Sequence, residues 1–475
     1  DPDHVAILVF SLLLGGMVGI ISRSGGTVGL VDALAAGATS RRHGQLTTWF
    51  LGVAIFFDDY ANTLVVGNSM RPVTDRLKIS REKLAYIVDS TAAPVAAVAL
   101  ITTWIGAEVS YIGDALADIG SDLDAYVVFL QSIPYNFYPF LALVFGFSIA
   151  VSRRDFGPMF RAERRALGGQ VLREGAQPLS DFDNEALRAI PGKPHRWFNA
   201  AIPVATVIAV TLAGQWITGR AALAAEGEAS ATAGVLELGL RGLGTVFSAG
   251  DSYRALMWAA FAGCVVALAL ARTQAVLTLE QGLTAWAQGM KSMVLAFVIL
   301  TLAWSIGDVC GDLSTANFIA DFLNGVLDPR LLPALVFIVA AGIAFATGTS
   351  WGTMGLLIPL AVPASFELTR SAALGPEAAH AIFLGSAAAV LSGAIFGDHC
   401  SPISDTTVLS SIASGCDHVD HVRTQLAYAL TVGAIVIVLV YLPEAVGVSP
   451  WLCLLAGGVT LAAIVRFVGR PVEAA

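Results

Sequence analysis

Residues 54–70 read AIFFDDYANTLVVGNSM, and residues 342–358 read GIAFATGTSWGTMGLLI. Each is an apolar stretch with a polar break at its centre, and the second break also contains glycine. Lipid offers no hydrogen bonds, so the backbone and side chains of such a break must face a site enclosed by protein. Two similar breaks at corresponding positions in two halves of a chain indicate the binding site of a membrane transporter.

The composition is that of an all-α polytopic membrane protein. Hydrophobic residues make up 56% of the 475 residues and charged residues 13%, with a mean hydropathy of +0.72. Many apolar runs reach the roughly 20 residues that a helix needs to cross a bilayer. The five cysteines show no metal-binding spacing, and no GxxxxGK[ST] motif for ATP is present. The net charge of -9 comes mostly from loops, and nothing suggests a nucleic acid partner.

Apolar runs predict a set of membrane spans and two helical hairpins. The spans are expected at 4–22, 84–106, 135–152, 199–218, 251–271, 291–308, 381–396 with a broken continuation to 416, 424–443 and 449–468. The hairpins, at 46–70 and 331–366, are expected to be re-entrant, so that each returns to the side from which it entered. Shorter amphipathic stretches at 27–40, 119–133, 274–289 and 314–326 are typical of interfacial segments.

The distribution of positive charge supports re-entrant hairpins. With this topology, all but five of the 27 Lys and Arg residues fall on one side, in the segments 23–42, 71–83, 153–196, 272–291 and 423–470. The other side holds Arg220, Arg241, Arg254, Arg330 and Arg370, and an acidic loop with Glu108, Asp114, Asp118, Asp122 and Asp124. The basic side, with the C-terminus, should be cytoplasmic. If either hairpin crossed fully, the asymmetry would disappear.

In this topology the two hairpins open to opposite sides, which predicts inverted repeats. We expect a first repeat at 1–152, a cytoplasmic linker at 153–198 and a second repeat at 199–475. The second repeat has two spans before the segment that matches the start of the first. Together with the absence of an initial Met, this predicts one or two helices ahead of residue 1.

Each repeat has a further polar break after its hairpin. Residues 89–96 read DSTAAPVA, and residues 397–407 read GDHCSPISDTT. Proline removes a backbone donor, and the carbonyls freed beside carboxylate and hydroxyl oxygens suit a hard cation such as Na+. An ionised carboxylate in mid-membrane is costly unless it is paired, protonated or bound to a cation, so the candidates are Asp58, Asp59, Asp89, Asp398 and Asp405.

Structural roles compete with these functional ones. Ser and Thr hydroxyls in membrane helices often bond to their own backbone. Asp89 has a possible ion-pair partner in Arg81 or Lys83, and His399 could be a proton relay or a hydrogen-bonded core residue. Helix geometry places Asp58 about 100° away from Asp59, where it would hold the hairpin in place. Asp251 and Arg254, one turn apart, are expected to form a salt bridge.

FFDDYANTLVVG, GTSWGTMG and GDHCSPISDTT, followed by CDHVDHVRTQLAYAL, strongly resemble the NhaC family of sodium/proton antiporters over essentially the whole chain. The resemblance is to a wider ion transporter superfamily with elevator-type movement, whose members are commonly homodimers. It implies that the ion site is lined by Asp59, Asn62, Thr63, Thr349, Ser350, Thr353, Asp398, Ser401, Ser404, Asp405 and Thr406. Proton coupling would involve Asp59, Asp398, His399 and Asp405, with supporting roles for Asp58, Asp89, Ser90 and Thr91.

The predicted function is a secondary antiporter, not an enzyme, that exchanges Na+ for H+ in the cytoplasmic membrane without a cofactor. Some family members exchange organic solutes, so a Na+- or H+-coupled exchanger of a small carboxylate or amino acid is the alternative, with Tyr60, Arg71, Trp351 and His399 available for contact. An aspartyl protease using Asp59 and Asp398 is disfavoured because the GxGD pattern is missing. A passive channel is disfavoured because paired broken hairpins suit alternating access.

Overall fold

The computed structural model describes most of the chain. The described residues are 2–26, 28–29, 40–56, 59–99, 104, 108, 111–113, 115–116, 120–121, 123, 125–179, 189–228, 235–291, 293–294, 298, 328–371 and 374–473. This part is almost entirely helical, apart from β1 (Arg154–Asp155) paired with β2 (Arg470–Pro471). Within it, 6 helices are long and apolar enough to cross a membrane, or up to 7 if the bent pair Val127–Tyr135 and Phe137–Ser152 is one span.

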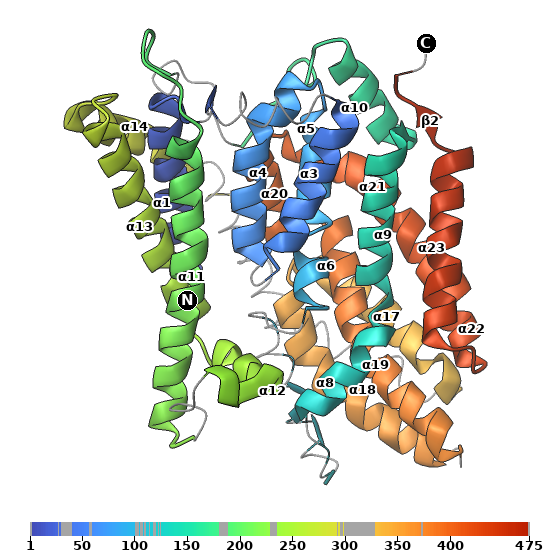
Figure 1. The fold of residues 1–475 in the computed structure, drawn as a ribbon. Coiled ribbons are helices and arrows are strands. Elements are labelled where there is room, and N and C mark those ends of the chain that lie inside the picture. Colours follow the sequence, from blue (N-terminus) through green and yellow to red (C-terminus); the bar gives the residue numbers. More distant parts are fainter. Residues whose placement is uncertain are drawn as a thin grey trace.

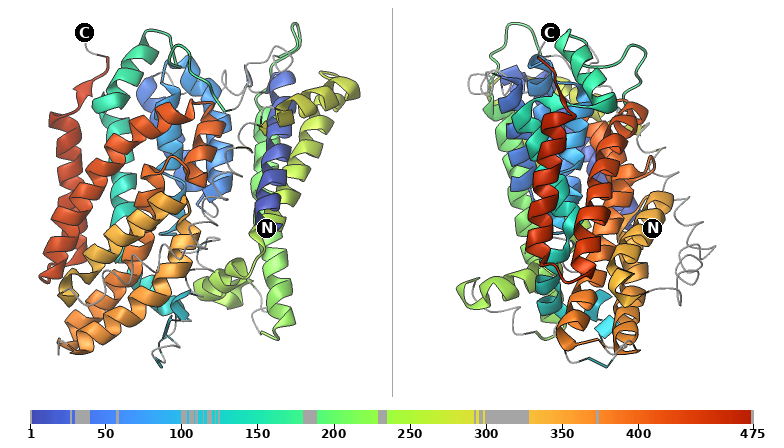
Figure 2. Two further views of the ribbon diagram at one scale, coloured as in Figure 1. Left: turned by 180° about the vertical axis from the view of Figure 1, so that it is seen from behind. Right: turned by 90° about the vertical axis from the view of Figure 1, so that its right-hand side faces the viewer.

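One group of helices stands apart in Figures 1 and 2, and we call it the first body. Its members are α1 (Pro2–Arg23), α11 (Phe198–Ala225), α12 (Val235–Ser248), α13 (Ser252–Thr273) and α14 (Leu279–Lys291). Gly15 and Gly19 of α1 lie directly against backbone atoms of Gly289 and Ala285 on α14. A Cβ atom at either glycine would meet a carbonyl oxygen at 2.9 or 2.4 Å, so these helices pack closely.

The remaining helices form a second body around two helix pairs and two broken helices. The pairs are α3 (Arg41–Ala54) with α4 (Asp59–Arg76), and α17 (Leu332–Thr347) with α18 (Ser350–Ser371). The broken helices are α5 (Arg81–Asp89) with α6 (Ala93–Ala96), and α19 (Pro376–Cys400) with α20 (Asp405–Ser414). Figure 1 shows α3, α4, α5 and α20 in the upper half of the molecule, and α18 and α19 in the lower half.

Further helices cover the second body. They are α8 (Ala125–Ser132), η1 (Ile133–Tyr135), α9 (Phe137–Ser152), α10 (Gly157–Leu167), η4 (Pro329–Leu331), α21 (His418–Ile435), η5 (Val436–Tyr441), α22 (Leu442–Ala445) and α23 (Pro450–Phe467). The core of this body is a large apolar cluster that includes Phe145, Phe337 and Tyr428. Its outer surface is apolar too, with Trp451, Leu455 and Val459 of α23 exposed. Such a surface suits contact with lipid.

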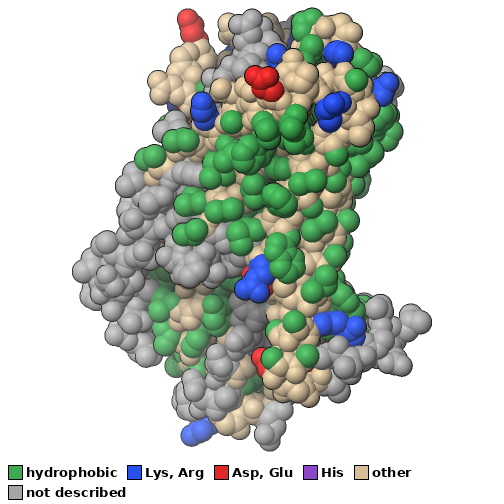
Figure 3. Space-filling view, turned by 90° about the vertical axis from the view of Figure 1, so that its left-hand side faces the viewer, with side chains coloured by type: hydrophobic (Ala, Val, Ile, Leu, Met, Phe, Trp, Pro, Cys, Tyr) green, Lys and Arg blue, Asp and Glu red, His purple; other side chains and the backbone are tan. Residues whose placement is uncertain are grey.

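Ion pairs join several segments at one end of the molecule, which we call the basic end. The start of α3 meets the end of α4 there, because the Arg41 guanidinium donates to the Lys78 carbonyl, and Arg41 also pairs with Glu163 of α10. Lys83 pairs with the buried Asp155 of β1. Figure 3 shows most Lys and Arg of one face at this end, beyond a broad apolar band. The predicted clustering of basic segments is therefore present in the fold.

Most predicted spans are observed as helices with similar bounds. The polar breaks at 89–96 and 397–407 are confirmed, since α5 ends at Asp89 and α19 ends at Cys400. The predicted salt bridge between Asp251 and Arg254 is confirmed at 3.4 Å at the start of α13. Asp58, most of 27–40 and of 291–308, and all of 314–326 lie outside the described residues.

Candidate functional site

Three helices begin where the pairs and the broken helices meet, and we call this region the junction. Asp59 is the first residue of α4, Ser350 of α18 and Asp405 of α20. A helix N-terminus carries unpaired N–H groups and a partial positive charge, which favours carboxylates. Asp59 and Ser350 are nearly fully buried, and Asp405 is 8% exposed.

The α17–α18 pair joins the α19–α20 break directly. Ser350 Oγ donates a hydrogen bond to Asp398 Oδ2, and Ser401 Oγ donates to the Phe345 carbonyl at 2.9 Å. The turn residue Gly348 has a φ of 72°, and a Cβ atom there would lie 2.6 Å from the Ile403 carbonyl oxygen. Glycine is therefore required at this turn for both its conformation and its close approach.

Asn62 joins the α3–α4 turn to the α5–α6 break. Its amide nitrogen lies 2.6, 3.1 and 3.0 Å from the carbonyl oxygens of Gly52, Ile55 and Thr91. These contacts satisfy carbonyls that the helix ends leave without backbone partners. The amide oxygen of Asn62 and the hydroxyl of Thr63 are buried and have no hydrogen-bond partner among the described residues.

The two breaks come together across the junction. The Tyr60 hydroxyl of α4 donates to Asp405 Oδ2 of α20. Asp398 lies close enough to Asp405, Asp89 and Asp59 for their charges to interact. Its second oxygen, Oδ1, is buried and has no hydrogen-bond partner among the described residues. The two polar breaks therefore lie close together, and their carboxylate oxygens are of the chemical type that hard cations bind.

Asp89 does not form the ion pair that was left open as a structural alternative. Arg81 pairs with Asp75 and Lys83 with Asp155. The two basic residues lie at the start of α5, at the basic end, while Asp89 is at the other end of the helix.

The partners of Asp89 come instead from α20 and α21. Thr407 Oγ1 donates to Asp89 Oδ2 at 3.1 Å, Gln425 Nε2 donates to the same oxygen, and His421 Nε2 lies 3.4 Å away. His421 and Gln425 are one turn apart on α21, so they present their side chains on one helix face. Both residues lie in the segment CDHVDHVRTQLAYAL, but the sequence analysis did not predict a role for either of them.

His399 is hydrogen-bonded within the core. Its Nδ1 lies 2.9 Å from the Tyr138 hydroxyl, and its carbonyl accepts from Gln425 Nε2 at 3.1 Å. Its Nε2 has no partner. Nδ1 is therefore held by a structural hydrogen bond, while Nε2 is available to bind or release a proton.

Several predicted hydroxyls are occupied by local bonds. Thr353 Oγ1 donates to the Thr349 carbonyl at 2.8 Å, and Thr91 Oγ1 donates to the Ile87 carbonyl at 2.8 Å. Ser90 Oγ bonds to the Ile87 carbonyl as well, at 3.2 Å, and Ser404 Oγ lies 3.1 Å from Thr406 Oγ1. Bonds of this kind leave the oxygen lone pairs free to accept a cation. Within the described ranges, no group of three or more His, Cys, Asp or Glu is placed to hold a metal ion.

The carbonyl oxygen of Pro402 is not open to a cation. His418 Nε2 lies 2.6 Å from this oxygen, and since a carbonyl can only accept, the imidazole is the donor. The Ser411 hydroxyl then donates to His418 Nδ1, at 2.9 Å. His418 therefore stabilises the break.

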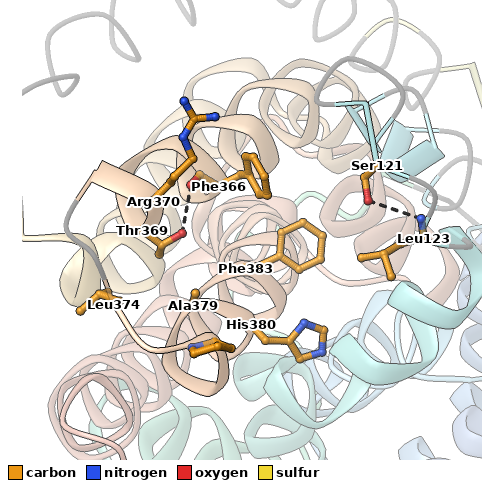
Figure 4. Close-up of a pocket in the computed structure, with 10 residues that line it drawn as sticks. Ser121, Leu123, Phe366, Thr369, Arg370, Leu374, Ala379, His380 and Phe383 are labelled. Carbon is orange, nitrogen blue, oxygen red and sulfur yellow. Dashed lines mark hydrogen bonds between the residues drawn. The ribbon is translucent and has the colours of Figure 1, made fainter.

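A cavity of about 290 Å³ lies away from the junction, between the end of α18 and the start of α19. Figure 4 shows Phe366 and Phe383 facing it, with Arg370 and His380 also in its lining. The residues that we expected to contact an organic solute do not line it. Tyr60 is instead bonded to Asp405, and Trp351 packs on Trp104.

Sequence reasoning placed Glu108 in an acidic loop outside the predicted spans, but its side chain is not exposed as loop residues usually are. The side chain is fully buried, and in the described part of the chain neither carboxylate oxygen has a hydrogen-bond partner. The prediction failed because the nearby residues Asp114, Asp118, Asp122 and Asp124 make the whole segment look polar. Only the packing of Trp104 and Ile112 in the apolar core reveals its burial.

Comparisons with known proteins agree with this picture. The model of the Na+/H+ antiporter family matches residues 95–442, so the chain belongs to this family of membrane antiporters. An uncharacterized protein of Haemophilus influenzae is 33% identical over 431 residues, covering 90% of this chain and 76% of that protein. The malate-2H+/Na+-lactate antiporter of Bacillus subtilis is 34% identical over 112 residues, 22% of this chain and 21% of that protein.

Among solved structures, the YdaH transporter of Alcanivorax borkumensis matches with a TM-score of 0.35 and 14% identity, covering 99% of this chain and 88% of that chain. This likeness is too low to support an argument about the fold. Family membership makes the protein a multi-pass membrane transporter, which is not a class of enzyme.

Proposed function

We propose that this protein is a secondary antiporter that exchanges Na+ for H+ across the cytoplasmic membrane. The observation that carries the proposal is the junction, where the buried Asp59 begins α4, Ser350 of α18 bonds to the buried Asp398, and Tyr60 of α4 bonds to Asp405 of α20. Several buried carboxylates in one site are costly unless cations or protons neutralise them. Competition between Na+ and H+ for the same oxygens is sufficient for exchange.

In this proposal Na+ is the transported substrate. The buried oxygens without partners, on Asn62, Thr63 and Asp398, support a cation site. The remaining ligands would come from Asp59, Thr349, Ser350, Thr353, Ser401, Ser404, Asp405 and Thr406. The proton would be carried by Asp59, Asp398 or Asp405, with His399 as a relay. No resident cofactor is required, since ion gradients supply the energy.

The proposal includes inverted repeats with re-entrant hairpins and an elevator-type movement. The Arg41 contact with the Lys78 carbonyl supports a first pair that starts and ends at the basic end. The two bodies meet through apolar side chains, including Leu14, Leu64 and Val204 around a void of about 30 Å³. A mainly apolar contact of this kind suits relative movement. We also propose a homodimer with the linker and the C-terminus in the cytoplasm.

The test is transport by the purified protein in proteoliposomes that contain a pH-sensitive dye. Addition of Na+ alone should move protons, and Li+ and K+ added separately should define the cation preference. If Na+ moves no protons in the absence of an organic solute, Na+/H+ exchange is refuted.

The second candidate is exchange of a small carboxylate coupled to these ions. It is supported by the cavity of about 290 Å³, in which the Arg370 guanidinium could pair with a carboxylate. The similarity to a malate and lactate antiporter adds support over its short length. Labelled malate, lactate and amino acids in the same proteoliposomes decide between the two. Proton movement that requires one of these solutes would favour the second candidate.

A further inference from the structure

Glu108 is a buried carboxylate that the proposed exchange does not yet use. Its side chain is 0% exposed. In the described ranges, neither Oε1 nor Oε2 has a hydrogen-bond partner. A carboxyl group in such a place must be neutral or must receive a cation, since an isolated ionised group is far too costly to bury.

The residues on either side of Glu108 place it against the start of α18. The Trp104 ring packs edge-on against the Trp351 ring, with centroids 5.7 Å apart. The phenol of Tyr111 lies against Gly355, where a Cβ atom would be 3.1 Å from Tyr111 Oη. Residues 104, 108 and 111 are each helical, and their spacing of four and three positions favours one helix face, which points to a place for Glu108 between these two contacts. The indole N–H of Trp351 also has no hydrogen-bond partner.

The first turn of α18 connects Glu108 with the junction. Ser350, which donates to Asp398, and Trp351, which packs on Trp104, are consecutive residues. Consecutive side chains on a helix diverge by about 100°. The same turn therefore contacts the proposed cation site on one side and the segment of Glu108 on another, so a movement of α18 changes both environments.

We propose that Glu108 is a proton-binding site separate from the carboxylates that hold Na+. This inference rests on the proposed Na+/H+ exchange, and it assigns the proton whose movement is coupled to Na+ to Glu108 in place of Asp59, Asp398 or Asp405. With the proton on a carboxylate oxygen, the segment packs against α18 without a buried charge. When α18 moves and the group becomes hydrated, the proton is released, and the ionised side chain opposes return until another proton binds.

Among the described residues, the contacts on either side of Glu108 involve the Trp104 indole and the Tyr111 phenol of its own segment, and Trp351 and Gly355 of α18. The charged residues of α18, Glu367 and Arg370, lie about three turns beyond Gly355. In this part of the chain neither carboxylate oxygen of Glu108 has a hydrogen-bond partner.

The first experiment compares two fluxes in proteoliposomes, using Glu108→Gln, Glu108→Asp and Asp398→Asn. Glutamine has the shape of the protonated glutamic acid, so we expect a folded protein. Glu108→Gln should lose Na+ uptake driven by a pH gradient, but keep wild-type exchange of internal Na+ for external labelled Na+. Glu108→Asp should retain both fluxes with a shifted pH profile, and Asp398→Asn should lose both.

Two results would overturn the proposal: wild-type uptake under a pH gradient in Glu108→Gln, or loss of both fluxes in that variant while it remains folded.

The second experiment does not measure transport. A hydrophobic carbodiimide, which reacts with protonated carboxyl groups in apolar surroundings, should modify Glu108 at neutral pH, as peptide mapping would show. If Glu108 of the wild type is labelled but the protein exchanges no Na+ for H+, the proposed Na+/H+ exchange is refuted and proton binding at Glu108 is still supported. If Glu108 is not labelled, proton binding at Glu108 is refuted.

Discussion

Buried carboxylates from three helices lie at the junction: Asp59 of α4, Asp398 of α19 and Asp405 of α20. Asp59, Asp398 and Asp405 each interrupt an apolar run, and an ionisable group at such a place is visible in the sequence. Their meeting at one junction follows from contacts such as Tyr60 with Asp405 and Ser350 with Asp398. Each of these contacts joins segments that are distant in the sequence or lie on different helices.

The partners of these groups could not be predicted in the same way. Asp89 is bound by Gln425 and approached by His421, from a helix that begins more than 300 residues later. A polar residue in the sequence of a membrane helix predicts that its side chain has a polar partner, but it does not predict which residue that partner is. Glu108 shows the opposite failure, because a carboxylate among acidic neighbours gives no sign of burial.

Replacing either Asp398 or Asp405 by Asn should abolish Na+-evoked proton movement. Loss of a contact with a charged group costs about 1.5–3 kcal/mol, which corresponds to a loss of roughly 10- to 100-fold in cation affinity. The measurement is the dye signal in proteoliposomes at matched protein content. Asp251→Asn is the control, because Asp251 caps α13 and pairs with Arg254 outside the junction. Near-normal exchange in both site variants would remove them from the mechanism.

At the scale of elements, the turns and breaks depend on a few residues whose side-chain amide or backbone makes contacts between helix ends. Asn62 bonds to three carbonyls at the ends of α3 and α5, and Gly348 allows the α17–α18 turn to touch the α19–α20 break. Local sequence predicted where the helices are interrupted, because Gly, Pro and Ser disfavour continued helix in the apolar runs. It could not predict which break each turn would contact, since that depends on tertiary packing.

Gly348→Ala should destabilise the protein and reduce exchange. The left-handed conformation alone costs about 1–2 kcal/mol for a residue with a Cβ atom, and the contact of 2.6 Å with the Ile403 carbonyl would force the turn away from the break. Gly342→Ala is the matched control on α17, because a Cβ atom there meets nothing within 4 Å. Melting temperature in detergent and Na+-evoked proton movement are measured for both variants. Equal melting temperatures would show that the turn does not need glycine.

At the scale of the whole molecule, the two bodies do not follow the order of the chain. α1 packs with α13 and α14, whereas α3 and α4, which follow α1 closely in sequence, belong to the other body. Linear order suggested repeats but could not show which helices pack together. The charge pattern was more informative, because the basic segments of α3, α5 and α10 meet through ion pairs at one end.

The proposed orientation predicts which positions a membrane-impermeant maleimide reaches in intact cells. Single cysteines are placed at exposed sites in a variant without native cysteines. Glu377→Cys, at the start of α19, should be labelled from outside, because it lies at the end opposite the basic end. Glu174→Cys should be labelled only after permeabilisation. Arg42→Cys and Arg76→Cys, at the start of α3 and the end of α4, should both behave like Glu174→Cys, because a re-entrant pair returns to the side where it began. Labelling of Arg42→Cys and Arg76→Cys from opposite sides would show that this segment crosses the membrane, and the inverted-repeat topology would then be wrong.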